Sequence, residues 1–138
     1  MASVVLIAKI GTSSLTDAQG HVRKDVIQKL CDEVASVRAG DRQVVIVSSG
    51  AIGAGLPAIG FPDQRPRDAR TLQAASAVGQ SRLMALYDEA LARHDLVAGQ
   101  VLLAPFDFFE RSQYLQARGT LERLLELGVV PVINENDA

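Results

Sequence analysis

The sequence predicts an α/β fold with a mostly parallel sheet and helices on its faces. Three observations support this fold class. Four short apolar runs do not alternate with polar residues, helix-spaced segments separate them, and aromatic residues make up only 4% of a chain that is 48% hydrophobic. The apolar content is therefore mostly Val, Ile, Leu and Ala, which is typical of parallel strands buried beneath helices.

The four apolar runs are residues 4–8, 44–47, 97–103 and 129–133. Because none alternates cleanly with polar residues, we expect strands that are buried on both faces. Pro131 lies inside the last run, and a proline removes a donor from the hydrogen-bond ladder. We keep this strand in the sheet, although Pro131 disfavours a central position for it.

Apolar residues at helical spacing fill each interval between the runs. The predicted helices cover residues 26–37, with Gly40 at the C-terminal cap, residues 72–90, and residues 115–125, closed by Gly128. Strands and helices thus alternate along the chain, which predicts right-handed crossovers between parallel strands.

Two segments and two glycines depart from this pattern. Residues 56–70 hold three prolines and three arginines, which predicts a long loop that is a lid or an insertion. Residues 105–110 hold three of the four phenylalanines, as a plug over the sheet edge or as a subunit interface. A glycine inside a helix costs about 1 kcal/mol relative to alanine. Gly79 therefore suggests close approach by another backbone or a ligand, and Gly119 suggests close packing.

Size, charge and cysteine content limit the class of protein. The 138 residues suit one domain or an incomplete one, and a net charge of −2 does not indicate a nucleic-acid or membrane surface. The first residues lack the basic start of a signal peptide, and no apolar run approaches the ~20 residues that cross a bilayer. We therefore expect a cytoplasmic protein. Cys31, the single cysteine, is expected to be a small buried hydrophobe.

Polar residues follow the predicted strands directly, and parallel sheets bind ligands at the carboxyl ends of their strands. The first strand leads into Lys9-Ile10-Gly11-Thr12-Ser13, and the second leads into Ser48-Ser49-Gly50-Ala51. Glycine allows a backbone to approach a phosphate or carboxylate closely, and neighbouring N–H groups can point at its oxygens. Each segment is an anion site or an ordinary turn; two such strand ends in one sheet favour a site at the second.

The fourth strand leads into Asn134-Glu135-Asn136-Asp137. This cluster is either a solvated loop or a binding site, in which Asp137 receives an ammonium group and Asn134 forms directional hydrogen bonds. Its oxygens also suit a hard metal ion. Other motif classes are missing: the P-loop pattern, a glycine-rich dinucleotide motif after the first strand, a His–Cys cluster for zinc, and a nucleophile–His–Asp set.

Four segments together resemble the glutamate 5-kinase branch of the amino acid kinase family. They are residues 9–13 (KIGTS), 49–52 (SGAI), 77–83 (AVGQSRL) and 130–138 (VPVINENDA). Each is unspecific alone, but the combination, in this order and spacing, is specific. The resemblance runs from residue 5 to residue 138. Residues 105–109 and Gln116 depart from the family pattern, which affects subunit contacts and regulation rather than the class.

The resemblance implies a three-layer α/β/α sandwich and ATP-dependent phosphorylation of the glutamate side-chain carboxylate, the first step of proline biosynthesis. By this resemblance Lys9 is catalytic and binds the ATP phosphates. Gly11, Thr12 and Ser13, which follow it in the first glycine-containing turn, are expected to bind the nucleotide with it. The residues assigned to L-glutamate are Ser49, Gly50, Ala51, Asn134 and Asp137. Mg²⁺ is expected to arrive with ATP, with no protein residue assigned as a metal ligand, and the protein is expected to form a homo-oligomer.

We expect residues 1–138 to be the N-terminal, substrate-binding part of this kinase domain, without the nucleotide-binding half or a PUA domain. That part alone is expected to be inactive. Three alternatives stay open: another carboxylate, carbamate or phosphate kinase of the same fold, a nucleotide-binding oxidoreductase, and a non-catalytic module that binds amino acids or assembles with partners.

Overall fold

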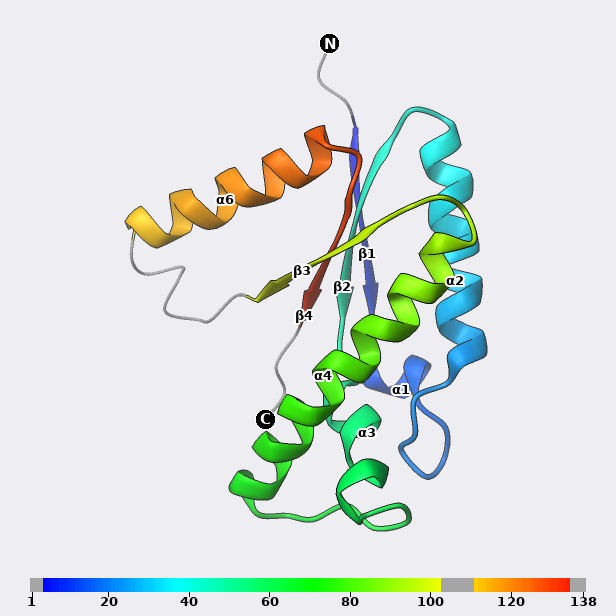
Figure 1. Ribbon diagram of the computed structural model, residues 1–138, viewed down its shortest axis with the longest axis vertical. Coiled ribbons are helices and arrows are strands. Elements are labelled where there is room, and N and C mark those ends of the chain that lie inside the picture. The colour runs from blue at the N-terminus through cyan, green and yellow to red at the C-terminus, as the bar shows by residue number, and fades with distance from the viewer. Residues whose placement is uncertain (1–3, 103–110, 135–138) are drawn as a thin grey trace.

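The computed structural model describes residues 4–102 and 111–134, and the strands in these ranges form one parallel sheet (Figure 1). The strands are β1 (Val5–Ile10), β2 (Gln43–Ser48), β3 (Ala98–Leu102) and β4 (Val130–Asn134). Their order across the sheet is β1-β2-β4-β3, and every pairing is parallel. The predicted strands and the α/β fold class are therefore confirmed.

The three predicted helices are also present, each longer than its apolar pattern. They are α2 (Lys24–Ala39), α4 (Ala69–Ala92) and α6 (Arg111–Glu126). Three short elements were not predicted, namely α1 (Thr12–Leu15), α3 (Ala51–Gly55) and the 3₁₀ helix η1 (Pro57–Ile59). The segment 56–70 is thus only partly a loop, because η1 and the first residues of α4 occupy its two ends.

The helices lie on both faces of the sheet. Alternate residues of a strand face opposite sides, and Val44 and Ile46 of β2 share one core with α2 and α4. On the other face Gln43 Nε2 donates a hydrogen bond to the Leu125 carbonyl of α6, at 3.2 Å. Figure 1 shows α6 on the opposite side from α2 and α4. The crossover from β3 to β4 steps back across the sheet, so right-handedness places its helix on the opposite face.

Pro131 lies in a central strand, contrary to the expectation that it would be peripheral. β4 pairs with β2 on one side and with β3 on the other. The Val130 N–H donates to the Val97 carbonyl on the β3 side, at 2.9 Å. Since N–H groups alternate in direction along a strand, the nitrogen of Pro131 faces β2, where the pairing starts only at Val132. The missing donor therefore removes no bond of the ladder.

The expectation of burial on both faces is wrong for β1. This strand lies at the sheet edge, and the Ile7 side chain is 71% exposed. Ile7 faces the α6 side, because its neighbours Ala8 and Ile10 pack into the core with α2 and α4. Helix α6 packs instead near β3, where Leu124 lies close to Gly99. An unbroken apolar run therefore did not distinguish a covered strand from an edge strand.

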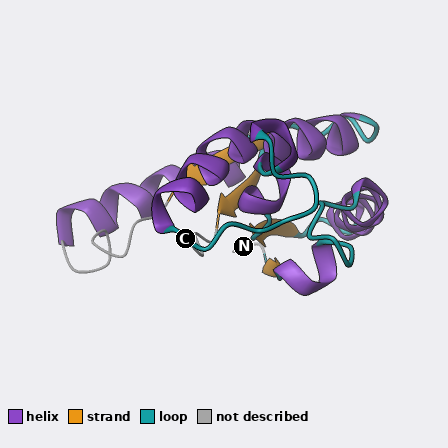
Figure 2. Ribbon diagram, turned by 90° about the horizontal axis from the view of Figure 1, so that it is seen from below, coloured by secondary structure: helices purple, strands orange, loops and turns teal. Residues whose placement is uncertain are grey.

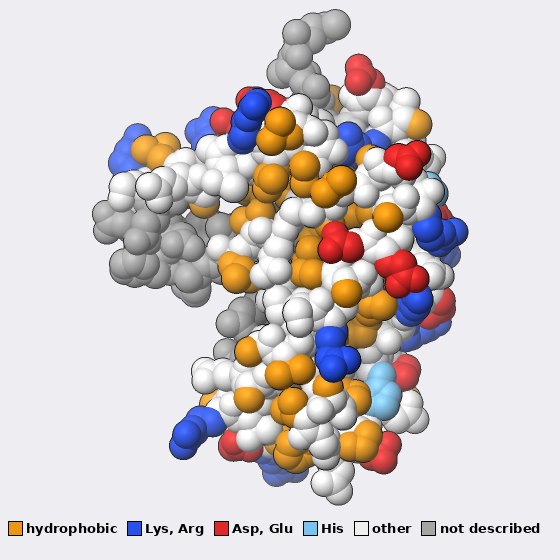
Figure 3. Space-filling model, viewed as in Figure 1, with side chains coloured by type: hydrophobic (Ala, Val, Ile, Leu, Met, Phe, Trp, Pro, Cys, Tyr) orange, Lys and Arg blue, Asp and Glu red, His pale blue; other side chains and the backbone are white. Residues whose placement is uncertain are grey.

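Figure 3 shows charged side chains along the side that carries α2 and over α6, with apolar side chains across the middle of the same view. Two surface pairs involve α2: Lys24 contacts Glu89 of α4 at 3.1 Å, and Asp32 contacts His94, just after the end of α4, at 2.6 Å. Exposed pairs of this kind contribute about 1 kcal/mol or less. The fold thus depends mainly on its core, which includes Cys31 as predicted; burial raises the pKa of this thiol to about 12.

Within the described ranges, none of the helices combines the length and the apolar character needed to cross a bilayer.

Helices α3 and α4 cross with their backbones in contact. A Cβ atom added at Gly79 would overlap the carbonyl oxygen of Ala51, and one added at Gly55 would overlap the carbonyl oxygen of Ala75. The predicted close approach at Gly79 is therefore confirmed as a backbone contact. At Gly119 the prediction of close packing is wrong, since no atom lies within 4 Å of an added Cβ.

We expect Gly79→Ala to lower the free energy of unfolding by about 3 kcal/mol or more, because backbone atoms of α3 cannot move aside as a flexible side chain can. Gly119→Ala is the matched control. It should raise the free energy of unfolding by about 1 kcal/mol, because alanine has the higher helix propensity and its methyl group meets no other atom at this position. Urea unfolding of both variants measures this. Equal stability of the two variants would contradict the tight crossing.

Candidate functional site

The carboxyl ends of the parallel strands lie at one rim of the sheet, which faces the viewer in Figure 2. Two short helices begin there. Helix α1 starts at Thr12, directly after Gly11, and α3 starts at Ala51, directly after Gly50. Gly50 has φ 107°, a left-handed conformation that glycine adopts readily. The two glycine-containing turns predicted to bind anions are therefore neighbours at this rim.

A hydrogen bond between hydroxyl groups joins the two turns. Thr12 Oγ1 donates to Ser49 Oγ at 3.1 Å, and Ser49 Oγ donates to the Ile10 carbonyl at 3.3 Å. The Ser49 backbone N–H also donates to the Ile10 carbonyl, at 3.2 Å. Ser49 is only 1% exposed. Its hydroxyl therefore holds the ends of β1 and β2 together.

Packing of α1 supports the same junction. Leu15 of α1 is fully buried, and its Cδ2 atom lies 2.5 Å from the position of a Cβ added at Gly50. A side chain at position 50 would displace Leu15 as well as strain the backbone. Gly50 therefore serves both the turn geometry and the contact between α1 and the second turn.

Tyr87 of α4 is a contributor to this rim that the sequence analysis missed. Its hydroxyl donates to Ser48 Oγ at 2.8 Å, and Ser48 Oγ donates to the Ser49 carbonyl at 2.8 Å. Burial raises the pKa of Tyr87 to about 12, so the phenol stays protonated and remains a donor at neutral pH. A tyrosine in the otherwise aliphatic stripe of Leu83 and Leu91 was the available signal, because a buried tyrosine hydroxyl requires a partner.

Lys9 and Asn134 flank the joined turns on opposite faces of the sheet. Lys9 is exposed, and its Cα pairs with that of Val47. It therefore faces the α6 side, opposite to Ile10. Asn134 ends β4, its Cα pairs with that of Ser48, and it faces the α4 side. Among the described residues, its buried Oδ1 atom accepts no hydrogen bond.

The predicted site residues are thus brought together at the rim as far as the structure describes them. The end of β4 lies next to the two turns, which are residues 9–13 and 49–51. Asp137 and the segment 105–110 lie outside the described residues. In the part of the chain that is described, no group of three or more His, Cys, Asp or Glu side chains is placed to hold a metal ion.

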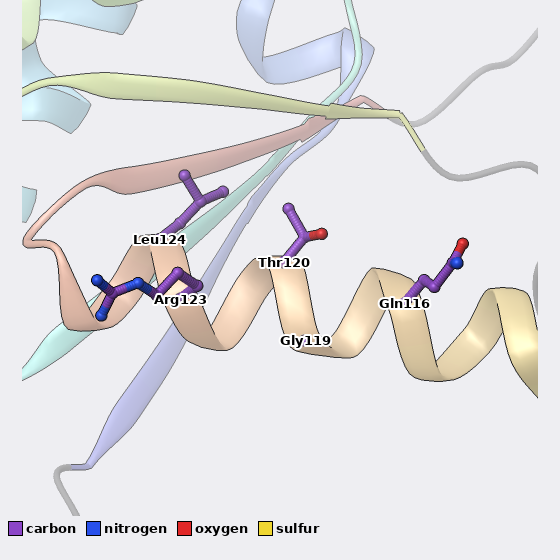
Figure 4. Close-up of a pocket in the computed structure, with 5 residues that line it drawn as sticks. All are labelled: Gln116, Gly119, Thr120, Arg123 and Leu124. Carbon is purple, nitrogen blue, oxygen red and sulfur yellow. The ribbon is translucent and has the colours of Figure 1, made fainter.

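A shallow depression of about 510 Å³ lies elsewhere, along α6 (Figure 4). It is lined by Gln116, Gly119, Thr120, Arg123 and Leu124. Leu124 lies near Gly99, at the amino end of β3, 3.3 Å from the position of an added Cβ. This depression contains none of the predicted site residues, so we do not assign it to the site.

We expect Thr12→Val and Ser49→Ala to be coupled in a double-mutant cycle of unfolding free energy, by about 0.5–1.5 kcal/mol, the net contribution of one hydrogen bond. Ser36 is exposed on α2, so Thr12→Val combined with Ser36→Ala should be additive. Additive effects of Thr12→Val and Ser49→Ala would mean that the two hydroxyls do not hold the turns together.

Comparisons with known proteins place this architecture in a family. Residues 4–138 match the Amino acid kinase family. Glutamate 5-kinase of Bifidobacterium longum subsp. infantis is 46% identical over 137 residues, which cover 99% of this chain and 36% of that protein. The Thermobifida fusca glutamate 5-kinase is 47% identical over 132 residues, which cover 96% of this chain and 34% of that protein. The chain thus spans about a third of the length of these curated relatives.

Solved structures share the fold at lower sequence identity. The isopentenyl phosphate kinase of T. acidophilum superposes with a TM-score of 0.60 at 18% identity, covering 99% of this chain and 58% of that one. Giardia carbamate kinase gives a TM-score of 0.59 at 12% identity, covering 97% of this chain and 60% of that one. Because the family match extends over nearly every residue and the fold agrees, this chain belongs to the amino acid kinase family.

Proposed function

We propose that residues 1–138 form the substrate-binding part of a kinase domain that transfers the γ-phosphoryl group of ATP to the side-chain carboxylate of L-glutamate. The observation that carries the proposal is the Thr12–Ser49 hydrogen bond, which holds two glycine turns side by side at the rim of the sheet. Two adjacent anion sites are what a reaction between a phosphate and a carboxylate requires. The names of the curated relatives support glutamate as the acceptor.

The proposed reaction needs positioning and charge neutralisation rather than a protein nucleophile. The glutamate side chain is already ionised at neutral pH. One carboxylate oxygen forms a bond to the γ-phosphorus while the bond from that phosphorus to the bridging oxygen of ADP breaks. The products are an acyl phosphate, proposed as the first intermediate of proline synthesis, and ADP. Catalysis then consists of aligning the two anions and stabilising the charge that develops on the phosphoryl oxygens.

We assign phosphate binding and glutamate binding to residues on different sides of the joined turns. Lys9 is exposed at the end of β1, where its ammonium can meet phosphate oxygens as a point charge. The backbone of residues 11–13 follows shortly after Lys9, and we assign it to binding the nucleotide. Residues 49–51, Asn134 and Asp137 are assigned to glutamate, with the Asp137 carboxylate receiving the α-ammonium group.

Mg²⁺ is proposed to enter with the nucleotide. When bound, it would neutralise phosphate charge and orient the γ-phosphoryl group. We assign no protein residue as its ligand. We also propose a cytoplasmic homo-oligomer as the working form.

Two other acceptor classes are the competing candidates. The fold is shared with the carbamate kinase and the isopentenyl phosphate kinase that superpose on this chain. A full-length enzyme bearing this sequence should therefore be assayed for ADP release with glutamate, carbamate and isopentenyl phosphate in parallel. Turnover with carbamate or isopentenyl phosphate and not with glutamate would replace our assignment.

In the full-length enzyme we expect Lys9→Ala to lower kcat by about 100-fold or more, with little change in the KM for glutamate, because its charge acts on the phosphoryl group in the transition state. Asp137→Ala should instead mainly raise the KM for glutamate. Lys29→Ala, which removes the same charge from the exposed face of α2, is the control and should alter neither constant. A proportional effect of Lys9→Ala on kcat and on glutamate binding would argue against its catalytic role.

The isolated 138-residue chain is expected to show no glutamate-dependent ADP release, because we assign the main nucleotide contacts to residues that it does not contain. A coupled assay for ADP at high protein concentration measures this. Turnover above the glutamate-free background would show that these residues suffice for catalysis.

A further inference from the structure

We propose that Gln80 of α4 is a further substrate-binding residue, whose side-chain carbonyl accepts a hydrogen bond from the α-ammonium group of the bound amino acid. This inference rests on the proposed function and extends its binding site from the sheet rim to the helix above it.

Gln80 Oε1 and Asn134 Oδ1 are both buried, and within the described part of the chain neither accepts a hydrogen bond. Burial of a carbonyl oxygen without a donor is unfavourable, and buried polar groups are nearly always paired. The contrast with the nearby hydroxyls is sharp, because Ser48, Ser49 and Tyr87 are all hydrogen-bonded. A bound ligand that supplies donors accounts for the two exceptions.

The geometry of α4 places Gln80 above the rim. Gln80 precedes Tyr87 by seven residues, which is nearly two turns, so both project from the same side of the helix. The Tyr87 hydroxyl reaches Ser48 at the end of β2. Because α4 runs opposite to the strands (Figure 1), Gln80 lies about 10 Å further toward and past the strand ends. Its neighbour Gly79 touches the Ala51 carbonyl, which begins α3.

Asn134 approaches the same turn from the sheet. Its Cα pairs with that of Ser48, and alternation of the strand directs both residues to the α4 face. Asn134 is therefore level with the start of the turn of residues 48–50, and Gln80 lies on the same side of the sheet, past the strand ends. Neither group belongs to the Lys9 side of the sheet, where the phosphates are assigned.

The hydrogen-bonding character of Gln80 Oε1 and Asn134 Oδ1 indicates which group of the amino acid they bind. Both unpartnered atoms are acceptors, and an ammonium group provides three donors together with a positive charge. Hydrogen bonds to charged groups are stronger than those between neutral groups. A carboxylate brings only acceptors and would leave both oxygens unpaired. The ligand end that meets Gln80 is thus the α-ammonium, which leaves the side-chain carboxylate free to meet the phosphate.

The test compares Gln80→Met with Gln73→Met in the full-length enzyme. Methionine keeps the length of glutamine without its amide, and Gln73 is exposed on the same helix. For Gln80→Met we expect an affinity for glutamate at least about 10-fold weaker by calorimetry, with an unfolding midpoint of the ligand-free protein equal to or above that of wild type. The preference for glutamate over glutarate, which lacks the ammonium, should shrink. Gln73→Met should leave affinity and preference unchanged.

A weaker affinity accompanied by a matching loss of ligand-free stability would make Gln80 a structural residue and overturn the inference. Unchanged affinity, or an unchanged preference for glutamate over glutarate, would overturn it as well. These outcomes differ from failure of the proposed function, in which the wild-type enzyme itself would not bind glutamate; that result would overturn both.

Discussion

The hydrogen bond from Thr12 to Ser49 is the contact on which the candidate site depends. It adds a side-chain contact between the turns after β1 and β2, two strands that already pair up to Ile10 and Ser48. Ser49 is almost fully buried, whereas Thr12 is exposed, so the contact lies where the core meets the surface of the rim. The adjacent backbone of residues 11–13 and 49–51 is thereby kept in one arrangement. A site for two reacting anions requires this kind of preorganisation, because misplacement of the reacting groups by about 1 Å can lower the rate about 100-fold.

The close crossing of α3 and α4 extends the same constraint to the helical layer. Gly55 and Gly79 allow backbone contact between the helices, so α3 cannot shift without moving α4. Helix α4 in turn carries Tyr87, which is tied to Ser48, and Gln80, which has no described partner. The rim therefore combines a hydroxyl network that stabilises the turns with two buried amide oxygens that accept no hydrogen bond among the described residues. This difference is the basis for proposing that Gln80 binds a ligand.

Pattern reasoning predicted the elements well and their environment less well. Apolar runs and helical spacing predicted the strands and the three long helices, since both follow from local periodicity. The same runs overestimated the burial of β1, because a run does not reveal whether a helix covers it. Pro131 was expected at the periphery and lies in a central strand, because the effect of a missing N–H depends on which neighbour that nitrogen faces. Gly79 and Gly119 looked alike in sequence, yet only Gly79 meets another backbone.

Residue order alone was sufficient for the fold class, the family resemblance and the glycine turns at the strand ends, because each is written in short stretches of neighbouring residues. Only the tertiary structure showed three other features. They are the hydrogen bond between Thr12 and Ser49, the contact of Tyr87 with Ser48, and the buried oxygens of Gln80 and Asn134 that have no partner among the described residues. These contacts link residues that are far apart in sequence, and their existence depends on strand order, register and helix orientation. No local pattern contains that information, because it arises when the helices pack onto the sheet.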